Sequence, residues 1–348
     1  MVIIIFLNKL YNINLYKMTI INGIEIDNIK YVENPIKDSI INNTPIENNL
    51  HVIMVISNPC QFAKRYILAK EFKYRMEKEL NVILYIVELA YSNQEYHLTD
   101  LSNKNHLRLY TDTSPLWHKE NMINIGVKKL LPHDWKAFAW IDADLEFDNS
   151  NWALDALKIL NGSKDIIQLF SHCIDMDKNE LTMSIWSSFG FQYMKNKNYS
   201  TNTTGNNFWH PGYAWAINRS AYDKLGGLFQ LSILGSGDHN MSLSLLGNGI
   251  HSVNSKVTIE YKSLILDFQN KCKNLRLGYI PGIIRHYFHG SKINRKYSER
   301  WQILIKNEYN PLTHITTNKD GLLIPTKECP KQLLDDILKY FIERNEDE

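Results

Sequence analysis

Cysteine is scarce in this chain, and the few residues present lie far apart. Cys60, Cys173, Cys272 and Cys329 are the only four, and they include no C-x-x-C pair. This spacing excludes a zinc ribbon and a disulfide-stabilised scaffold. It is typical of a protein that folds in a reducing compartment.

Long apolar runs and strong charge are lacking as well. The apolar residues 2–7 are far too few to span a bilayer, and no cleavage-site pattern follows them. The 39 Lys and Arg against 37 Asp and Glu give a formal net charge of +2, without a strongly basic block. A nucleic-acid partner is therefore not expected. We predict a soluble, cytoplasmic protein with no transmembrane segment.

Unbroken apolar runs and amphipathic segments alternate from residue 51 onward. Residues 52–56 and 82–87 are apolar throughout, as in strands that are buried on both faces. Between them, apolar residues recur at spacings of three or four from Phe62 to Leu80, which predicts an amphipathic helix. Strand, helix and strand in this order form a right-handed crossover between parallel strands. The sequence thus predicts an α/β fold with a mostly parallel central sheet flanked by helices.

Three regions of the 348 residues differ in pattern. Residues 1–48 show no firm element and are interpreted as an N-terminal extension or small cap. Residues 49–312 carry the α/β pattern and form the main domain. Within it, residues 171–207 lose periodicity and are interpreted as a functional loop or lid. Residues 313–348 form a C-terminal tail with an amphipathic helix.

Two carboxylates follow one of the buried apolar runs. Residues 137–141 show no period-two alternation, which predicts a strand with both faces covered, and Asp142 and Asp144 come directly after it. Residues i and i+2 of an extended segment point to the same face, so we expect the two carboxylates to project together. They would repel each other and lose hydration, and a divalent metal would compensate them. The alternative is a pair of turn or helix-capping aspartates.

Two further segments carry functional residue types. Asp238 follows glycines that allow a close approach of the backbone to a ligand, although taken alone it is an N-cap of the next helix. Farther along, His286 and His289 precede Lys292 and Arg295. Imidazole groups suit a metal and the cations suit an anion, so this cluster is a candidate binding site.

The order and content of these segments resemble the metal-dependent glycosyltransferases of the GT-A type. The resemblance covers about residues 50–310 and rests on five blocks, at residues 140–144, 211–217, 225–228, 235–238 and 286–292. It implies a nucleotide-sugar-binding fold and transfer of a sugar, most simply a hexose, from a nucleotide-diphosphate-sugar donor to an acceptor hydroxyl. It also implies a divalent metal, Mn²⁺ or Mg²⁺, that bridges the diphosphate, and a glycan or protein as acceptor.

The same resemblance implies roles for the metal-site residues. Asp144 and one histidine would ligate the metal, while Asp142 would ligate it or hold the ribose. A related group carries an H-x-x-G-x-x-K-P-W signature whose histidine binds metal. His286 has the matching separation from Lys292, but the glycine falls one place late and Pro-Trp is absent, so His289 remains the alternative. Imidazole in the ligand set favours Mn²⁺ over Mg²⁺.

Other residues are candidates for the donor and the acceptor. By the resemblance, Lys292 binds the departing phosphates with Arg295 as a helper, and Asp238 is the general base or orients the acceptor hydroxyl. If Asp238 is the base, the reaction inverts the anomeric carbon; if the site lacks such a base near the sugar, retention is expected. Candidate donor-binding residues are also found at strand ends, where a nucleotide base lies in open α/β sheets, and on the helix predicted after residue 115: Ser57, Asn58, Glu88, Lys119 and Asn124.

Two alternative functions use similar residues. A nucleotidyltransferase or a metal-dependent phosphohydrolase would also need aspartates and a divalent ion, but the sequence has no P-loop and no G-x-G-x-x-G. A catalytically decayed carbohydrate-binding protein would bind sugar without turnover. The frequent Asn, Ile, Lys and Tyr resemble the composition of large DNA viruses or their AT-rich hosts, so a viral protein in a host cytoplasm is also an expectation.

Overall fold

The fold is built on a seven-stranded sheet. The computed structural model describes residues 20–21, 24–25, 34–196, 199 and 205–348. The strand order is β13-β8-β12-β6-β3-β4-β5, and only β12 runs antiparallel to its neighbours. The strands are β3 (Leu50–Ser57), β4 (Val82–Tyr91), β5 (His106–Thr111), β6 (Ala137–Ile141), β8 (Ile166–Gln168), β12 (Ala214–Asn218) and β13 (Leu277–Tyr279). The predicted mostly parallel central sheet is confirmed.

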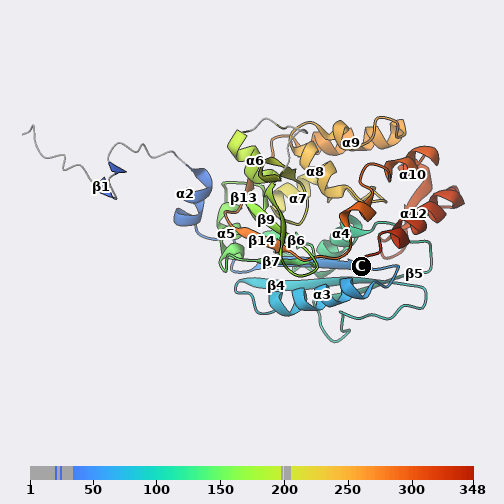
Figure 1. Ribbon diagram of the computed structural model, residues 1–348, viewed down its shortest axis with the longest axis horizontal. Coiled ribbons are helices and arrows are strands. Elements are labelled where there is room, and N and C mark those ends of the chain that lie inside the picture. The colour runs from blue at the N-terminus through green and yellow to red at the C-terminus, as the bar shows by residue number, and fades with distance from the viewer. Residues whose placement is uncertain (1–19, 22–23, 26–33, 197–198, 200–204) are drawn as a thin grey trace, which may run out of the picture.

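Helices cover both faces of this sheet (Figure 1). Alternate strand residues enter two separate apolar clusters: Ile53 and Trp140 face one side, while Val52 and Ala139 face the other. The first cluster packs against α4 (Lys119–Leu130), α7 (Arg219–Leu225), α8 (Gly237–Leu245) and α9 (Ile259–Cys272). The second packs against α2 (Pro35–Asn42), α3 (Ala63–Met76) and α5 (Trp152–Ile159). The predicted α/β class with flanking helices is confirmed.

A second sheet of five strands brings distant segments to the end of β6. Its order is β11-β10-β9-β14-β7, with β7 (Leu145–Phe147), β9 (His172–Met176), β10 (Thr182–Ser188), β11 (Trp209–His210) and β14 (Ile283–His286). Strand β14 pairs with β7, so that His286 lies opposite Leu145, and with β9, so that His286 lies opposite Asp175. From the sequence, residues 171–207 are interpreted as a functional loop or lid. Much of this stretch is regular structure and forms β9, β10 and α6 (Phe189–Asn196).

The remaining elements are short helices and strands. Within the described residues, 3₁₀ helices span Gly205–Asn207, Gly249–Ser252 and Lys292–Arg295. The C-terminal part holds α10 (Trp301–Lys306), α11 (Pro311–His314), β15 (Ile315–Thr317), β16 (Leu323–Pro325) and α12 (Lys331–Glu343). The tail helix predicted from the sequence is confirmed as α12, which buries Leu333, Ile337 and Phe341. No helix within the described ranges is long and apolar enough to cross a membrane.

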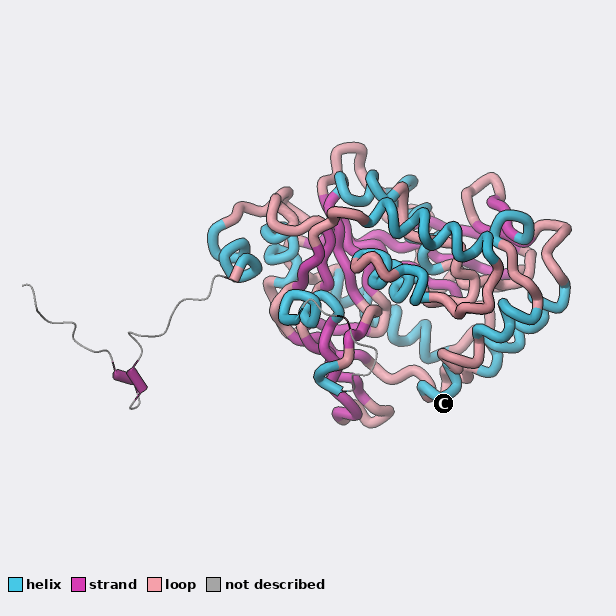
Figure 2. The backbone as a smooth tube through the Cα atoms, turned by 90° about the horizontal axis from the view of Figure 1, so that it is seen from above, coloured by secondary structure: helices cyan, strands magenta, loops and turns pink. Residues whose placement is uncertain are grey.

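Only part of the predicted N-terminal region can be compared with the structure. Residues 1–19, 22–23 and 26–33 lie outside the described residues, and β1 (Ile20–Ile21) and β2 (Ile24–Glu25) form a small antiparallel pair. Helix α2 and the residues after it lie against α5, as the tube view in Figure 2 also shows. The Ile46 N–H donates to the Leu157 carbonyl at 3.1 Å, which fixes this segment on the main body.

Candidate functional site

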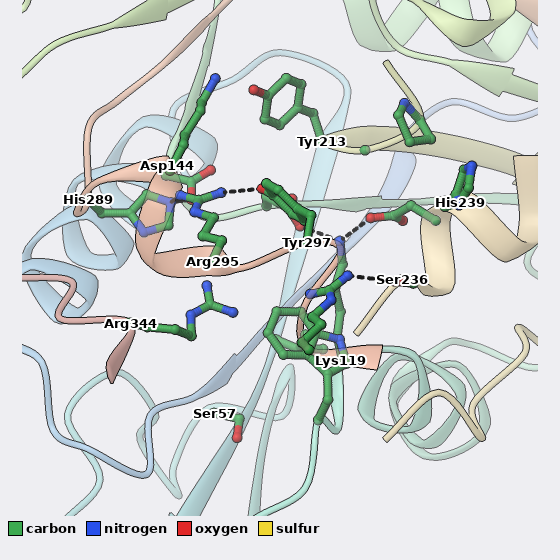
Figure 3. Close-up of a pocket in the computed structure, with 18 of the residues that line it drawn as sticks. Ser57, Lys119, Asp144, Tyr213, Ser236, His239, His289, Arg295, Tyr297 and Arg344 are labelled. Atoms are coloured by element: carbon green, nitrogen blue, oxygen red, sulfur yellow. Dashed lines mark hydrogen bonds and ion pairs between the residues drawn. The ribbon is translucent and has the colours of Figure 1, made fainter. Parts of the chain in front are cut away.

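A cavity of about 840 Å³ opens where the strands of the large sheet end (Figure 3). Its walls come from the end of β3, the segment after β6, the start of α8 and the loop after β14. The sequence-predicted residues that line it are Ser57, Asn58, Lys119, Asp142, Asp144, Asp238, His286, His289, Lys292 and Arg295. Ser57 and Arg295, which are 238 positions apart in the sequence, therefore meet around one space. Such a concave site with convergent polar groups is the usual form of a ligand-binding site.

The structure does not bring Glu88 and Asn124 to this cavity. The buried Glu88 carboxylate accepts hydrogen bonds from the backbone N–H groups of residues 97–99, at 2.6–3.2 Å. The Asn124 amide donates to the Leu228 carbonyl at 2.9 Å and accepts from the Leu228 N–H at 2.8 Å. Both side chains are used to fix loops, because a buried backbone group needs a hydrogen-bond partner.

Asp144 and both candidate histidines meet at one point of the cavity wall. The Oδ2 atom of Asp144 lies 2.9 Å from Nε2 of His289 and 3.9 Å from Nε2 of His286. One potential ligand atom from each residue lies within 4.8 Å of the others. The Oδ1 atom of Asp144 is buried and has no hydrogen-bond partner in the described part of the chain. A carboxylate and two imidazoles are a suitable donor set for a divalent transition metal such as Mn²⁺.

The charges around Asp144 favour its ionised form. Burial opposes ionisation, but the two histidines and Arg295 outweigh it and hold the pKa of Asp144 well below its usual range. Burial also lowers the pKa of His286, although Asp144 and Asp175 oppose this shift. Metals bind the ionised form of a carboxylate and the neutral form of an imidazole, so metal binding would release any proton that these histidines carry.

Asp142 faces a different partner from Asp144. The Lys119 Nζ atom lies 2.6 Å from Oδ1 of Asp142 and 3.0 Å from Oδ2 of Asp238, so one ammonium joins the two carboxylates. Burial raises the pKa of Asp142 to about 6, and Lys119 opposes this shift. The Asp142 N–H donates to the carbonyl of Tyr213, a residue with a positive φ of 82°, a backbone conformation that is uncommon outside glycine. Among the described residues, the metal-ligand group contains Asp144 but not Asp142.

Lys292 binds a buried carboxylate that the sequence analysis did not identify. Asp175, on β9, is only 1% exposed, and its Oδ2 atom forms an ion pair with the Lys292 ammonium. Its Oδ1 atom lies 2.7 Å from Nδ1 of His286. The ammonium also lies 5.0 Å from the centre of the Trp186 ring. Lys292 is thus at the cavity, as the sequence predicted, with its charge directed toward Asp175.

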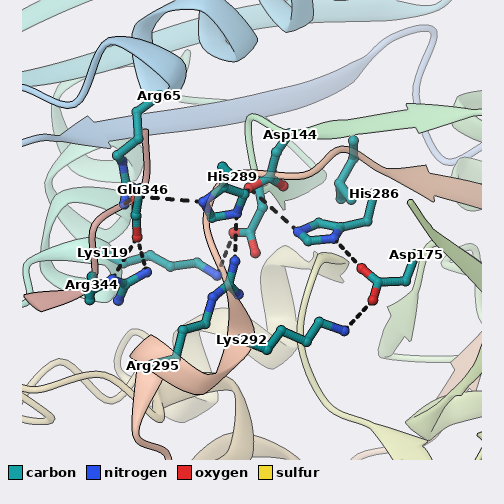
Figure 4. A network of polar contacts seen from close by, with 12 residues as sticks. Arg65, Lys119, Asp144, Asp175, His286, His289, Lys292, Arg295, Arg344 and Glu346 are labelled. Carbon is teal, nitrogen blue, oxygen red and sulfur yellow. Dashed lines mark hydrogen bonds and ion pairs between the residues drawn. The ribbon is translucent and has the colours of Figure 1, made fainter. Parts of the chain in front are cut away.

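A cluster of arginines surrounds the other side of His289 (Figure 4). The Arg295 Nη2 atom lies 2.9 Å from Nε2 of His289. Arg65, on α3, and Arg344, which follows α12, both bind the buried Glu346 carboxylate. Sequence reasoning missed these last three residues, because only the return of the tail to α3 brings them together, and no local spacing indicates that return.

Glu120 is a further buried carboxylate near the cavity. It lies on α4 beside Lys119, is 5% exposed, and packs so closely against α8 that a Cβ added at Gly237 would overlap its carboxylate. Burial raises the pKa of Glu120 to about 8, and the nearby Asp238 adds to the shift.

The raised pKa of Glu120 predicts that the stability of the protein depends on pH. Its ordinary pKa is 4.5 and its folded pKa is about 8, so the folded state binds this proton more tightly than the unfolded state. Glu120 therefore lowers stability progressively as the pH rises from about 4.5 to 8. We expect Glu120→Gln to melt at a higher temperature than wild type at pH 8, by roughly 2 °C or more. Thermal unfolding from pH 5 to pH 8 measures this difference.

The matched control for this prediction is Glu71→Gln, at an exposed position of α3. It should melt like wild type at every pH. A constant difference between Glu120→Gln and wild type across the pH range would show that Glu120 does not titrate there.

Comparisons with known proteins give only distant likenesses. No family model matches the sequence, and no curated protein is significantly similar to it. Among solved structures, Drosophila β-1,4-galactosyltransferase 7, in complex with manganese, UDP-Gal and xylobiose, is 10% identical, with a TM-score of 0.37 over 79% of this chain and 91% of its own. A Desulfovibrio desulfuricans protein assigned as a nucleotide-diphospho-sugar transferase is 7% identical, with a TM-score of 0.32 over 69% of this chain and 83% of its own.

A third solved structure, of S. aureus TarS, is 10% identical. Its TM-score is 0.29 over 64% of this chain and 71% of its own. Likenesses at this level carry no weight for the chemistry of the cavity, which depends on the residues of this chain.

Proposed function

We propose that this chain is a glycosyltransferase that moves a sugar, most simply a hexose, from a nucleotide-diphosphate-sugar donor to an acceptor hydroxyl of a glycan or protein. The observation that carries the proposal is the meeting of Asp144, His286 and His289 at the wall of a large cavity that also contains Asp238. A ligand set for a divalent ion and a separate carboxylate are the two parts that such a transfer needs.

The three convergent residues would hold Mn²⁺ or Mg²⁺, and the two imidazoles favour Mn²⁺. When bound, the ion would neutralise the diphosphate leaving group as a Lewis acid. The buried Oδ1 atom of Asp144, which lacks a hydrogen-bond partner among the described residues, supports this assignment. In this proposal both histidines, rather than one of the two sequence alternatives, are ligands.

Other cavity residues would bind the donor. Arg295 and Lys292 line the same wall as the metal-ligand group and would hold the phosphates. Asp142, fixed by Lys119, would accept hydrogen bonds from the ribose. Ser57 and Asn58 end β3 at the part of the cavity where we place the nucleotide base.

Asp238 would orient the acceptor hydroxyl and receive its proton. It lies in the first turn of α8, and Lys119 holds its carboxylate from one side. Proton transfer to Asp238 can be late, because the sugar develops positive charge before the new bond is complete. Attack assisted by this single base inverts the anomeric carbon.

The proposed transferase domain of residues 49–312 includes most of the cavity wall. The tail of residues 313–348 completes that wall with Phe341, Arg344 and Glu346. We therefore treat the tail as part of the functional unit and use the full chain in every experiment below.

Transfer of labelled sugar tests the proposal. We expect one or more nucleotide-sugars to raise the melting temperature in the presence of Mn²⁺, since a ligand that binds the folded state stabilises it. With that donor labelled in the sugar, the label should move to water or to an acceptor, and EDTA should stop the transfer. Transfer of labelled phosphate instead would indicate a nucleotidyltransferase or phosphohydrolase, and binding without turnover would indicate a carbohydrate-binding protein.

A further inference from the structure

His286 is held from behind by a buried carboxylate. The parallel pairing of β14 with β9 places His286 opposite Asp175, and their side chains meet with Nδ1 2.7 Å from Oδ1. The other oxygen of Asp175 binds Lys292 and accepts from Ser184 Oγ at 3.1 Å. Because the ammonium keeps Asp175 charged, its oxygen accepts and the histidine Nδ1 donates. In the neutral imidazole of His286, Nε2 therefore carries the lone pair, and it is this atom that faces Asp144.

The second histidine has two competing partners at one nitrogen. Its Nε2 atom lies 2.9 Å from Nη2 of Arg295, which donates, and 2.9 Å from Oδ2 of Asp144, which accepts. For Nε2 to ligate a metal beside Asp144, the proton of a neutral His289 must lie on Nδ1. This Nδ1 atom is buried without a hydrogen-bond partner among the described residues, and Glu346 Oε2 lies 3.6 Å from it.

Glu346 is fixed in this position by the tail around it. Arg65 Nη1 donates to its carboxylate at 2.8 Å, and Arg344 Nε donates at 2.6 Å. The tail backbone packs directly on Gly290, where an added Cβ would lie 2.8 Å from the Asn345 carbonyl oxygen. The next residue, Asp347, accepts from the first backbone N–H groups of α3 at 2.8 and 3.0 Å. The Glu346 carboxylate, which is only 2% exposed, is thus directed at Nδ1 of His289.

We propose that Asp175 and Glu346 are positioning residues that hold His286 and His289 as Nδ1–H tautomers, with both Nε2 lone pairs directed toward Asp144. The two carboxylates lie behind the two histidines on opposite sides of the group, as Figure 4 shows. A carboxylate behind a ligating histidine fixes the ring and increases its basicity. The inference rests on the proposed metal function of these histidines, and it makes residues of the C-terminal tail part of the metal centre.

Mn²⁺ affinity of paired variants tests the role of each carboxylate. Asp175→Asn and Glu346→Gln should each bind Mn²⁺ about 10- to 100-fold more weakly than wild type, as measured by titration calorimetry with the full chain. The matched controls are Asp148→Asn and Glu343→Gln, which remove surface carboxylates paired with Arg285 and Lys296. Both controls should bind Mn²⁺ like wild type.

The tautomers provide a second measurement that does not require a metal. Long-range ¹H–¹⁵N correlation spectra of the wild-type protein should show Nδ1–H imidazoles for His286 and His289, assigned with His286→Gln and His289→Gln. In Asp175→Asn, the His286 signal should shift toward the other tautomer, and in Glu346→Gln the His289 signal should do so. A merely structural role of the carboxylates would lower the melting temperature without changing the tautomers.

The results separate this inference from the proposed function. If wild type binds no Mn²⁺, the metal function fails, while the tautomer spectra still decide the present inference. If wild type binds Mn²⁺ and both variants bind it equally well, the inference is overturned. An Nε2–H tautomer of either histidine in the wild-type protein also overturns it, even where a variant fails to fold.

Discussion

Replacement of Asp144 by alanine should abolish Mn²⁺ binding and sugar transfer while the protein remains folded. Asp144 is the one carboxylate in the metal-ligand group, and its ionised state is maintained by the histidines and arginine around it. Without it, two imidazoles remain as ligands. The loss of a charged ligand worth several kcal/mol corresponds to a fall of roughly a thousandfold or more in affinity. Calorimetric titration with Mn²⁺ and transfer of labelled sugar measure the two effects.

Asp148→Ala is the matched control for this substitution. Asp148 lies four positions farther along the chain and pairs with Arg285 at the surface. It should leave both Mn²⁺ binding and transfer unchanged. Circular dichroism should show the same fold for both variants. Metal-dependent transfer that survives in Asp144→Ala would move the metal centre away from this residue.

Asp238→Asn should retain donor binding and lose transfer. The amide keeps the size of the side chain and can accept a hydrogen bond from Lys119, which lies 3.0 Å from the carboxylate in the wild-type protein. It cannot take a proton from an acceptor hydroxyl. Because general base catalysis contributes about 10²- to 10⁴-fold, we expect kcat to fall by that factor while the Kd for the donor stays within about twofold. Single-turnover transfer and donor titration measure the two quantities separately.

The control for Asp238 is Asp223→Asn, on the exposed surface of α7. This variant should transfer sugar at the wild-type rate. Unchanged transfer in Asp238→Asn would show that Asp238 is not the base and has only a structural place in the first turn of α8. A loss of donor affinity with unchanged kcat would instead show that Asp238 binds the donor. Inversion at the anomeric carbon, read from the product by NMR, is the stereochemical result that a single base predicts.

The elements with strong local signals were predicted well from the sequence. Residues 137–141 are apolar without alternation, and they form the fully buried strand β6. The apolar spacing in residues 332–344 predicted α12 for the same reason, since periodicity is a local property of the chain. Most of the predicted site residues also line one cavity, because the ends of parallel strands meet at one edge of a sheet.

The partners of those residues depend on long-range contacts, which the sequence does not show. Asp175 lies in a stretch without periodicity, and only the register of β9 against β14 places it behind His286. Asp142 and Asp144 are expected from the sequence to project together, but this expectation does not reveal their partners. Lys119 binds Asp142, and His289 binds Asp144. Glu88 is at a strand end, as expected, but neighbouring backbone N–H groups bind its carboxylate.

The contact between Arg65 and Glu346 joins residues that are 281 positions apart. During synthesis, Asp144 and the histidines leave the ribosome well before Glu346 does. A nascent chain can therefore form the large sheet and still lack the last wall of the cavity. A chain that has not been extended through α12 therefore lacks the part of the cavity wall that Phe341, Arg344 and Glu346 form.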